Sequence, residues 1–352
     1  MKKIGVIFGT RPEAIKLAPV IRELKKYFEV VVISTGQHRE LLDQIIDDLA
    51  IEIDYDLHVM TKDQTLSSLT IKLHEELSDL FDDEDFDLVV VQGDATTGMV
   101  GALEAFYHKI PVAHIEAGLR TNDIYAPFPE EVNRRIISQI AAYNFTPTDD
   151  ASFNLEEATG QIIKTGNTGI DTLLEVAKKI KVKPKRIVLV TLHRRESFGE
   201  KMEGIMDAIW NFVEVNETIE VLFPVHKNPN VQKMAERILG GHRRIILCRP
   251  LDYIDMIRAM KECLFIMTDS GGIQEEAPSL NKPVLVLRDT TERMEGVTLG
   301  VSKLVGTNPE DIFNEAEALL IPENYEKMTG WINPYGDGKA SQRIARYLKK
   351  CL

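Results

Sequence analysis

The sequence predicts an α/β protein built from two doubly wound parallel sheets, each in a domain of its own. Short runs rich in Val, Ile and Leu alternate with helical patterns along nearly the whole chain. The alternation pauses at 181–186, KVKPKR, which we interpret as an interdomain linker, and then restarts. A length of 352 residues suits two domains that each bury a core. We expect these domains to cover residues 1–170 and 171–337.

Each expected strand is a short apolar run that a polar or glycine-rich segment ends, which is typical of a buried parallel strand. In the first domain such runs lie at 3–8, 30–34, 87–92, 111–116, 143–147 and 161–165. Helical patterns lie at 13–26, 39–49, 65–81, 96–109, 129–141, 149–159 and 171–180. In the second domain, strands are expected at 187–192, 219–225, 244–249, 264–268 and 283–287, with helices between them. Helices at 309–320 and 338–350 close the chain.

The charge of the chain disfavours some partners and favours another. A formal net charge of −13 argues against binding to nucleic acid or to an anionic membrane surface. Cationic residues nevertheless gather at the ends of the expected strands, so we expect a small anion to bind in a cleft. These residues are Arg11, Lys16, Arg120, Arg134, His193, Arg194, Arg195, Lys227, Arg288 and Arg293.

Several sequence signals are absent. No apolar run has the length of a membrane span, and the three cysteines have no paired spacing, so we expect a protein of the reducing cytoplasm. No GxGxxG follows the first strand of either domain, and no cluster has zinc-ligand spacing. We therefore predict no nicotinamide or flavin cofactor and no metal.

The stretch 264–278 predicts an anion-binding turn. An apolar run ends at Asp269, and Gly271 and Gly272 then give a turn without side chains before a helix starts. Unpaired backbone N–H groups and the helix dipole favour a phosphate at such a turn. Two glutamates in the first helical turn could accept hydrogen bonds from a ribose. The alternative is an ordinary glycine turn with capping carboxylates.

Arg11 and Lys16 follow the first strand of the first domain. Pro12 suits the first turn of a helix, which leaves Arg11 at the strand end and Lys16 about one turn further on. Both side chains could clamp a pyrophosphate. The alternative is a solvated basic face.

Three carboxylates are candidates for proton transfer. Asp94 follows the strand 87–92, and Glu116 ends the strand 111–116. Two carboxylates at the ends of strands of one sheet can face one cavity, where burial and repulsion separate their pKa values into an acid and a base. The third candidate is one of the two glutamates Glu130 and Glu131, which follow a rigid Pro-Phe-Pro segment. Asp94 or Glu130 could instead cap a helix.

Two histidines follow strands of the second domain. His193 is placed to approach a leaving phosphate as a hydrogen-bond donor, either neutral or as imidazolium. His226 follows the next strand and competes for the same role.

Eleven segments stand in the order found in the non-hydrolysing UDP-N-acetylglucosamine 2-epimerases, and the chain resembles that family over essentially its whole length. They are GTRPEAIKLAPV, TGQHRELLDQ, QGDATT, HIEAGLRT, PFPEEVNRR, TGNTGID, HRRESFG, PVHKNPNV, TDSGGIQEEAPSL, RDTTER and NPYGDGKAS. The resemblance implies the GT-B architecture, in which two Rossmann-like domains face each other across a cleft. It also implies that the last helix, about 338–352, packs back on the first domain.

The resemblance implies reversible conversion of UDP-GlcNAc to UDP-ManNAc without a cofactor or an essential metal. The family reaction removes the C2 proton, expels UDP by anti elimination, and re-adds it to 2-acetamidoglucal after protonation from the other face. The implied catalytic residues are Asp94, Glu116, Glu130 and His193. The implied substrate-binding residues are Arg11, Lys16, Ser270, Gly271 and Gly272 near the diphosphate, Glu276 on the ribose, Arg293 on the substrate, and Leu251 and Met256 near the uracil.

The chain departs from the common family pattern in places. Leu251 and Met256 stand where several relatives have Gln and Phe, and Leu192 replaces a frequent Gly before HRRE. These changes bear on the contacts to base and sugar and leave the reaction class unchanged.

Other functions are compatible with the sequence. An epimerase of a related UDP-diacetamido sugar would share fold and mechanism, and a hydrolysing epimerase would release free ManNAc and UDP. A GT-B glycosyltransferase would need an acceptor cleft. A non-catalytic nucleotide-sugar sensor is disfavoured because every candidate acid, base and cation is present together.

The resemblance also implies a homodimer and, from bacterial members, a regulatory UDP-GlcNAc beside the active site. The residues that match the regulatory site are Gln37, His38, Arg39, Gln44 and Arg134. The alternative for the segment around Gln37 is a capped, solvated helix start.

Overall fold

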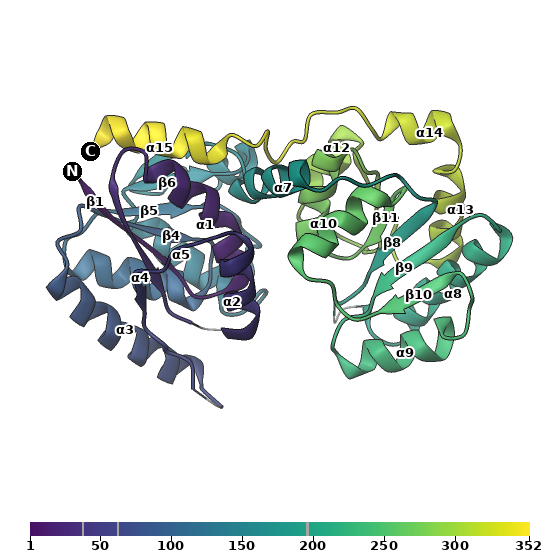
Figure 1. The fold of residues 1–352 in the computed structure, drawn as a ribbon, viewed down its shortest axis with the longest axis horizontal. Helices are drawn as coiled ribbons and strands as arrows, with labels where there is room; N and C mark the ends of the chain where they lie inside the picture. The colour runs from purple at the N-terminus through teal and green to yellow at the C-terminus, as the bar shows by residue number, and fades with distance from the viewer. Residues whose placement is uncertain (37–38, 62, 195–196) are drawn as a thin grey trace. The chain divides into compact units, whose positions relative to one another are not determined.

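The computed structural model describes residues 1–36, 39–61, 63–194 and 197–352. The chain forms two compact units, which are described separately: residues 1–172 with 336–352, and residues 173–335. Each unit is a parallel sheet with helices on its faces (Figure 1). The predicted pair of doubly wound α/β sheets is therefore confirmed.

The first unit contains a seven-stranded sheet in the order β3-β2-β1-β4-β5-β6-β7, and every pairing is parallel. Its strands are β1 (Lys3–Phe8), β2 (Glu29–Ser34), β3 (Tyr55–Asp56), β4 (Leu88–Gln92), β5 (Val112–Ile115), β6 (Tyr143–Thr146) and β7 (Gln161–Lys164). Its helices are α1 (Arg11–Leu24), α2 (Arg39–Asp48), α3 (Leu66–Asp83), α4 (Thr96–Tyr107), α5 (Glu130–Ile140), α6 (Asp149–Phe153) and α15 (Ala340–Cys351), with the first turn of α7 (Thr168–Lys179).

The centre of this sheet is buried on both faces. The β4 sequence LVVVQ is wholly buried, as expected for a β-branched run covered by helices on either side. β1 lies between β2 and β4, so the strand order reverses there. Open α/β sheets bind ligands outside the carboxyl ends of their strands at such a reversal. A ligand site of the first unit is therefore expected among the residues that follow β1, β4 and β5.

The second unit contains a six-stranded parallel sheet in the order β10-β9-β8-β11-β12-β13. Its strands are β8 (Ile187–Thr191), β9 (Glu220–Pro224), β10 (Ile245–Cys248), β11 (Ile266–Thr268), β12 (Val284–Val286) and β13 (Ser302–Leu304). Its helices are the rest of α7, α8 (Glu200–Val215), α9 (Pro229–Leu239), α10 (Tyr253–Glu262), α11 (Gly271–Glu276), α12 (Met294–Leu299), α13 (Pro309–Ala318) and α14 (Pro322–Lys327), with the 3-10 turn η2 (Ala277–Leu280).

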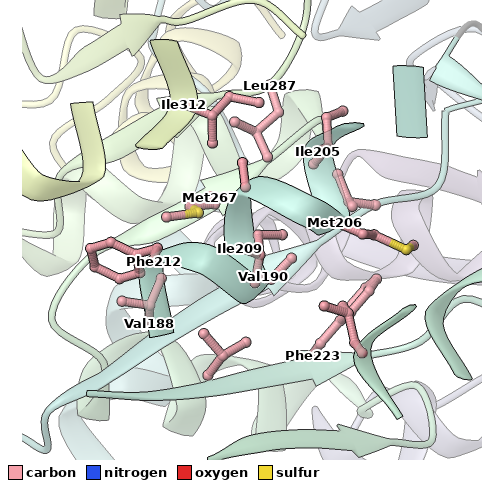
Figure 2. Packing of buried hydrophobic residues seen from close by; sticks show 14 of the residues in the cluster. Val188, Val190, Ile205, Met206, Ile209, Phe212, Phe223, Met267, Leu287 and Ile312 are labelled. Atoms are coloured by element: carbon pink, nitrogen blue, oxygen red, sulfur yellow. The ribbon is translucent and has the colours of Figure 1, made fainter. Parts of the chain in front are cut away.

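The core of the second unit forms where α8 packs on its sheet. Figure 2 shows Ile209 and Phe212 of α8 packed with Val188 and Val190 of β8 and with Met267 of β11. These side chains are fully buried. The strand order reverses between β8 and β11, so the residues after these two strands occupy the position expected for a ligand site.

Some elements differ from the sequence predictions. The strands β3 and β13 were not expected, because β3 has only two residues, both exposed, and β13 is only three residues long and carries an exposed lysine at its centre. The helix expected over 149–159 ends at Phe153. Asn154 follows it and donates its side-chain amide to the carbonyl of Gly118 at 3.0 Å, so a tertiary contact replaces the next helical turn.

The boundary between the units lies in α7, before the expected linker 181–186. The first turn of α7 is held by the first unit: Thr172 Oγ1 donates to the Ile15 carbonyl at 2.6 Å, and Ser341 Oγ donates to Asp171 at 2.5 Å. The end of α7 is held by Lys261, which donates to the Ala177 carbonyl. Residues 181–185 form no helix or strand. The helix α15 packs against α1 in the first unit (Figure 1).

None of the helices that the structure describes is both long and apolar enough to cross a membrane.

Glu13 fixes the turn between β1 and α1. Its Oε2 atom accepts hydrogen bonds from the backbone N–H groups of Gly9 at 3.1 Å and Thr10 at 2.8 Å, and from the Thr10 hydroxyl at 2.7 Å. The residue is 2% exposed, and Oε1 has no hydrogen bond in the described part of the chain. Burial raises the pKa of Glu13 to about 7, against the opposing effect of these hydrogen bonds, and the charge of Asp94 contributes to the rise.

We predict that Glu13→Gln reduces the pH dependence of stability. The pKa of Glu13 is raised from 4.5 to about 7, so the folded protein binds this proton more tightly than the unfolded chain does. The resulting stabilisation is fully present below the unfolded pKa and is lost as pH rises through about 7, by up to about 3 kcal/mol. Calorimetric unfolding temperatures of wild type and variant should converge or cross over this range.

A matched control is Glu23→Gln, near the end of α1, where the carboxylate pairs with Lys26 on the surface. This variant should follow the wild-type curve. Parallel curves for wild type and Glu13→Gln would contradict the prediction.

Candidate active site

Lys16 and Glu116 form an ion pair beyond the carboxyl ends of β1 and β5. Lys16 Nζ lies 2.6 Å from Oε1 and 2.5 Å from Oε2 of Glu116, and the side chain of Gln92 donates to Oε2. The Glu116 side chain is only 6% exposed. Its backbone has φ of 62°, in the left-handed region that residues with a Cβ rarely adopt. Strained positions of this kind gather at functional sites, and this one aims a buried carboxylate at a lysine.

Asp94 follows the neighbouring strand β4 and is held by α5. Arg134 Nη2 lies 2.6 Å from Asp94 Oδ2, and Asn133 donates its amide to the Asp94 carbonyl at 2.9 Å. Burial raises the pKa of Asp94, and the charge of Glu130 adds to the rise, while Arg134 and Lys16 oppose it. The carboxyl group is therefore easier to protonate than an ordinary aspartate.

His114 supports the turn that carries Asp94. Its ring is fully buried in β5, and Nε2 donates to the carbonyl of Gly93 at 2.7 Å. Burial lowers the pKa of His114 to about 4, so the imidazole is neutral at physiological pH and Nε2 carries its proton.

The structure separates the two glutamates at the start of α5. Glu131 is fully buried and lies 2.8 Å from Arg135, and it accepts the backbone N–H of Thr121 at 3.0 Å, so it holds the preceding loop. Glu130 is half-buried, and its Oε2 atom has no hydrogen bond among the described residues. Of the two, Glu130 is the carboxylate that is left to meet a ligand.

The second unit has the predicted order of strand, glycines and helix, but the helix starts earlier than predicted: α11 begins at Gly271, so the glycines lie in its first turn and Glu275 and Glu276 at its end. β11 ends at Thr268, Ser270 is the N-cap of α11, and Gly271 begins this helix. A Cβ added at Gly271 would lie 3.1 Å from Cζ of Arg293, so glycine allows the guanidinium to pack against the turn. Arg293 Nε donates to Glu275 at 2.8 Å. The other glutamate of this helix, Glu276, is half-buried.

Asp269 is a site residue to which sequence reasoning gave no role. It is fully buried, and its Oδ2 atom accepts the backbone N–H groups of His193 and Arg194, each at 2.8 Å. Its Oδ1 atom lies 2.8 Å from Nδ1 of His193. The signal was present in the sequence, because an acidic residue directly after a buried strand lies at the edge where ligands bind. Its partner is 76 residues away, and only the fold reveals the pairing.

Three other predicted site residues are half-buried, in or next to the helices α1 and α10. Leu251 precedes α10 and Met256 lies within it, and both are half-buried. Arg11 begins α1 and is half-buried. Gln37 and His38 lie outside the described residues, as does the side chain of Arg39, whose backbone begins α2.

An open cavity of about 700 Å³ lies elsewhere in the second unit, where α9 meets the ends of β9 and β10. Its lining includes Lys233, Arg237 and Arg249 and none of the predicted site residues. We therefore locate the candidate site by its chemistry and by the strand ends, because cavity volume does not mark it.

The described residues contain no group of three or more His, Cys, Asp and Glu side chains that could hold a metal ion. The first unit contains carboxylates paired with cations, which are groups that can transfer protons, and the second contains backbone N–H groups, a histidine and an arginine, which are groups that can bind an anion.

Known proteins resemble this chain along its whole length. The family model described as UDP-N-acetylglucosamine 2-epimerase matches residues 22–349. The enzyme of that name from Bacillus subtilis (strain 168) is 48% identical over 363 residues, covering 99% of this chain and 96% of the relative. The crystal structure of a putative enzyme of this name from Listeria monocytogenes has a TM-score of 0.93 at 43% identity and covers 100% of this chain and 97% of that one.

A second solved structure, the UDP-GlcNAc 2-epimerase from Neisseria meningitidis bound to UDP-GlcNAc, has a TM-score of 0.90 at 43% identity and covers 99% of this chain and 100% of that one. The expected GT-B class of fold is confirmed by these likenesses. With similarity of this extent along its whole length, the chain belongs to the UDP-N-acetylglucosamine 2-epimerase family.

Proposed function

We propose that this protein interconverts UDP-GlcNAc and UDP-ManNAc by inverting C2, without net hydrolysis and without a redox cofactor. The observation that carries the proposal is the pair of carboxylates Asp94 and Glu116, which follow neighbouring strands of one sheet. Gln92 at the end of β4 pairs in register with Ile115 of β5, and each carboxylate has a cation within 2.6 Å. Family membership supports the substrate, because the relative from Neisseria meningitidis binds UDP-GlcNAc.

The proposed reaction proceeds by elimination and re-addition. A carboxylate of the first unit accepts the C2 proton, the electron pair of the C2–H bond forms the C1=C2 double bond, and the C1–O bond breaks as UDP leaves with its electrons. Protonation of the resulting 2-acetamidoglucal at C2 from the opposite face and return of UDP to C1 give the epimer. The C2–H group is a weak acid, so the base must act while cations and amide groups neutralise the leaving diphosphate.

The other site residues have proposed roles in binding. Ser270 and the two following glycines would receive the diphosphate, with Arg11 and Lys16 as further cations. Arg293 would contact the substrate and Glu276 the ribose. Leu251 and Met256 would lie near the uracil.

Two related reactions differ from the proposed one in their products or in the residues that they need. A hydrolysing epimerase would release ManNAc and UDP as its main products. An epimerase of a diacetamido hexuronic acid would need a further cation for the sugar carboxylate. The homodimer and the cytoplasmic location stay predictions, as does the regulatory site.

We predict that incubation with UDP-GlcNAc in deuterium oxide gives a mixture of UDP-GlcNAc and UDP-ManNAc carrying deuterium at C2. An elimination route must pass the C2 hydrogen to a protein group that exchanges with solvent. Proton NMR of the products reads both epimer and label. Epimerisation with the original hydrogen fully retained would refute the mechanism.

We also predict that Asp94→Asn, Glu116→Gln and Glu130→Gln each lower kcat by roughly 10²-fold or more, with smaller effects on KM, because each removes a group that can exchange a proton. Steady-state rates with UDP-GlcNAc provide the measurement. Asp82→Asn is the matched control, since this carboxylate lies exposed on α3. Normal turnover in all three folded variants would exclude this proton-transfer set.

The regulatory proposal has its own test. Arg134 is already paired with Asp94, so an effector that contacts Arg134 would act directly on a proposed catalytic group. We predict that UDP-ManNAc alone is converted with a lag that a trace of UDP-GlcNAc abolishes, and that Gln37→Ala or Arg39→Ala weakens this activation before it weakens catalysis. Linear conversion of purified UDP-ManNAc from the start would return α2 to a structural role.

A further inference from the structure

We infer that His193 binds the leaving phosphate as a charged imidazolium, and that Asp269 is the positioning residue that holds the proton on its Nδ1 atom. The inference deepens the proposed function and rests on it for the identity of the ligand. Two features of the second unit carry it: the three-point hold of Asp269 on residues 193 and 194, and a contrasting arrangement at His226.

The carboxylate of Asp269 has both oxygen atoms assigned. Oδ2 accepts two consecutive backbone N–H groups, those of His193 and Arg194. Oδ1 is buried and lies 2.8 Å from Nδ1 of His193, an ion-pair distance, and it has no hydrogen bond of regular geometry in the described ranges. Burial alone would raise the pKa of Asp269, but the imidazole and the two N–H groups hold it below its ordinary value. A carboxylate facing Nδ1 requires a proton on that nitrogen.

The contact with Asp269 determines which groups His193 can present to a ligand. The side chain is 38% exposed, and Nε2 has no hydrogen bond among the residues that the structure describes. A neutral ring with its proton on Nδ1 would present the lone pair of Nε2 to a phosphate, which is repulsive. A ring protonated on both nitrogens presents an N–H donor and a positive charge. With Asp269 in this position, only the imidazolium form suits an anionic leaving group.

His226 is arranged in the opposite way. Its ring centroid lies 5.9 Å from that of His193, and its Nδ1 atom accepts the backbone N–H of Asn228 at 3.2 Å. A nitrogen that accepts carries no proton, so His226 is neutral with its proton on Nε2. Burial and the neighbouring charge of His193 lower the pKa of His226, while Asp269 opposes the shift. Of the two histidines that competed for the role, only His193 is arranged to carry the charge.

The substitution Asp269→Asn should switch the tautomer of His193. Two backbone N–H groups point at the Oδ2 position, so the amide oxygen of asparagine must occupy it and its NH2 group must face Nδ1. Nδ1 then accepts a hydrogen bond, and the proton moves to Nε2. The ring remains a donor at Nε2 but loses the carboxylate that stabilises its charge. The variant therefore shows whether His193 needs a positive charge or only a hydrogen-bond donor at Nε2.

The first test is NMR of the protein labelled with ¹⁵N-histidine, with and without UDP. In wild type we expect His193 to keep its Nδ1 proton when free and to carry protons on both nitrogens with UDP bound. In Asp269→Asn we expect a neutral ring protonated on Nε2. Glu214→Gln is the matched control: Glu214 faces Nε2 of His242, whose Nδ1 accepts the backbone N–H of Arg244, so the tautomer of His242 should not change.

The second test is kinetic. Asp269→Asn should lower kcat for UDP-GlcNAc by roughly 10-fold to 10²-fold, with a smaller change in KM, because the charge matters most as the diphosphate leaves. Asp269 acts through His193, so adding Asp269→Asn to His193→Ala should cause little further loss. Losses that add in the double variant would contradict the positioning role.

The outcomes distinguish the inference from the proposed function. A wild-type His193 that is neutral with UDP bound, or protonated on Nε2 alone, would overturn the inference whatever the activity. This measurement uses only the wild-type protein, so it does not depend on the folding of a variant. A protein that shows the expected ring states but does not epimerise UDP-GlcNAc would overturn the proposed function and leave the charged histidine in place.

Discussion

Both units depend on the same constraint: when a buried parallel strand ends, its next backbone N–H groups need acceptors that helix and sheet do not supply. Each unit meets this need with one buried carboxylate that accepts the N–H groups following its first strand. Glu13 accepts the N–H groups of Gly9 and Thr10 after β1. Asp269 accepts those of His193 and Arg194 after β8. The cationic residues that follow these strands are thereby fixed relative to their sheets.

The two carboxylates differ in the state that their surroundings favour. Asp269 shares its second oxygen with His193, so its pKa stays below the ordinary value despite burial. Burial raises the pKa of Glu13 to about 7, with a smaller contribution from the charge of Asp94, and its second oxygen has no hydrogen bond in the described part of the chain. In the second unit, the buried carboxylate of Asp269 is therefore ionised and lies next to the proposed donor His193. In the first unit, the buried carboxylate of Glu13 titrates near neutrality and holds the turn that precedes Arg11.

Short apolar runs followed by polar residues are visible in a linear sequence, and this pattern predicted both sheets and the positions of Asp94 and Glu116 after strands. What it could not predict are the pairings, which join residues far apart in the chain. Lys16, which was expected to bind a pyrophosphate, also contacts Glu116, 100 positions away. Asp269 had no assigned role for the same reason, and Glu130 could not be told from Glu131 until the contacts of the latter to Thr121 and Arg135 were known.

Under the proposed function, these pairings would let an acidic chain favour an anionic leaving group as it forms. At rest, Lys16 is neutralised by Glu116, and Arg134 by Asp94. If one of these carboxylates accepted the C2 proton it would become neutral, and the charge of its cation would be less compensated in a partly buried setting where charges interact strongly. Under the proposed function, positive potential would therefore rise in the same step in which the diphosphate gains negative charge. A site whose cations were unpaired from the start would bind substrate and leaving group alike, and only the interaction that grows towards the transition state accelerates the reaction.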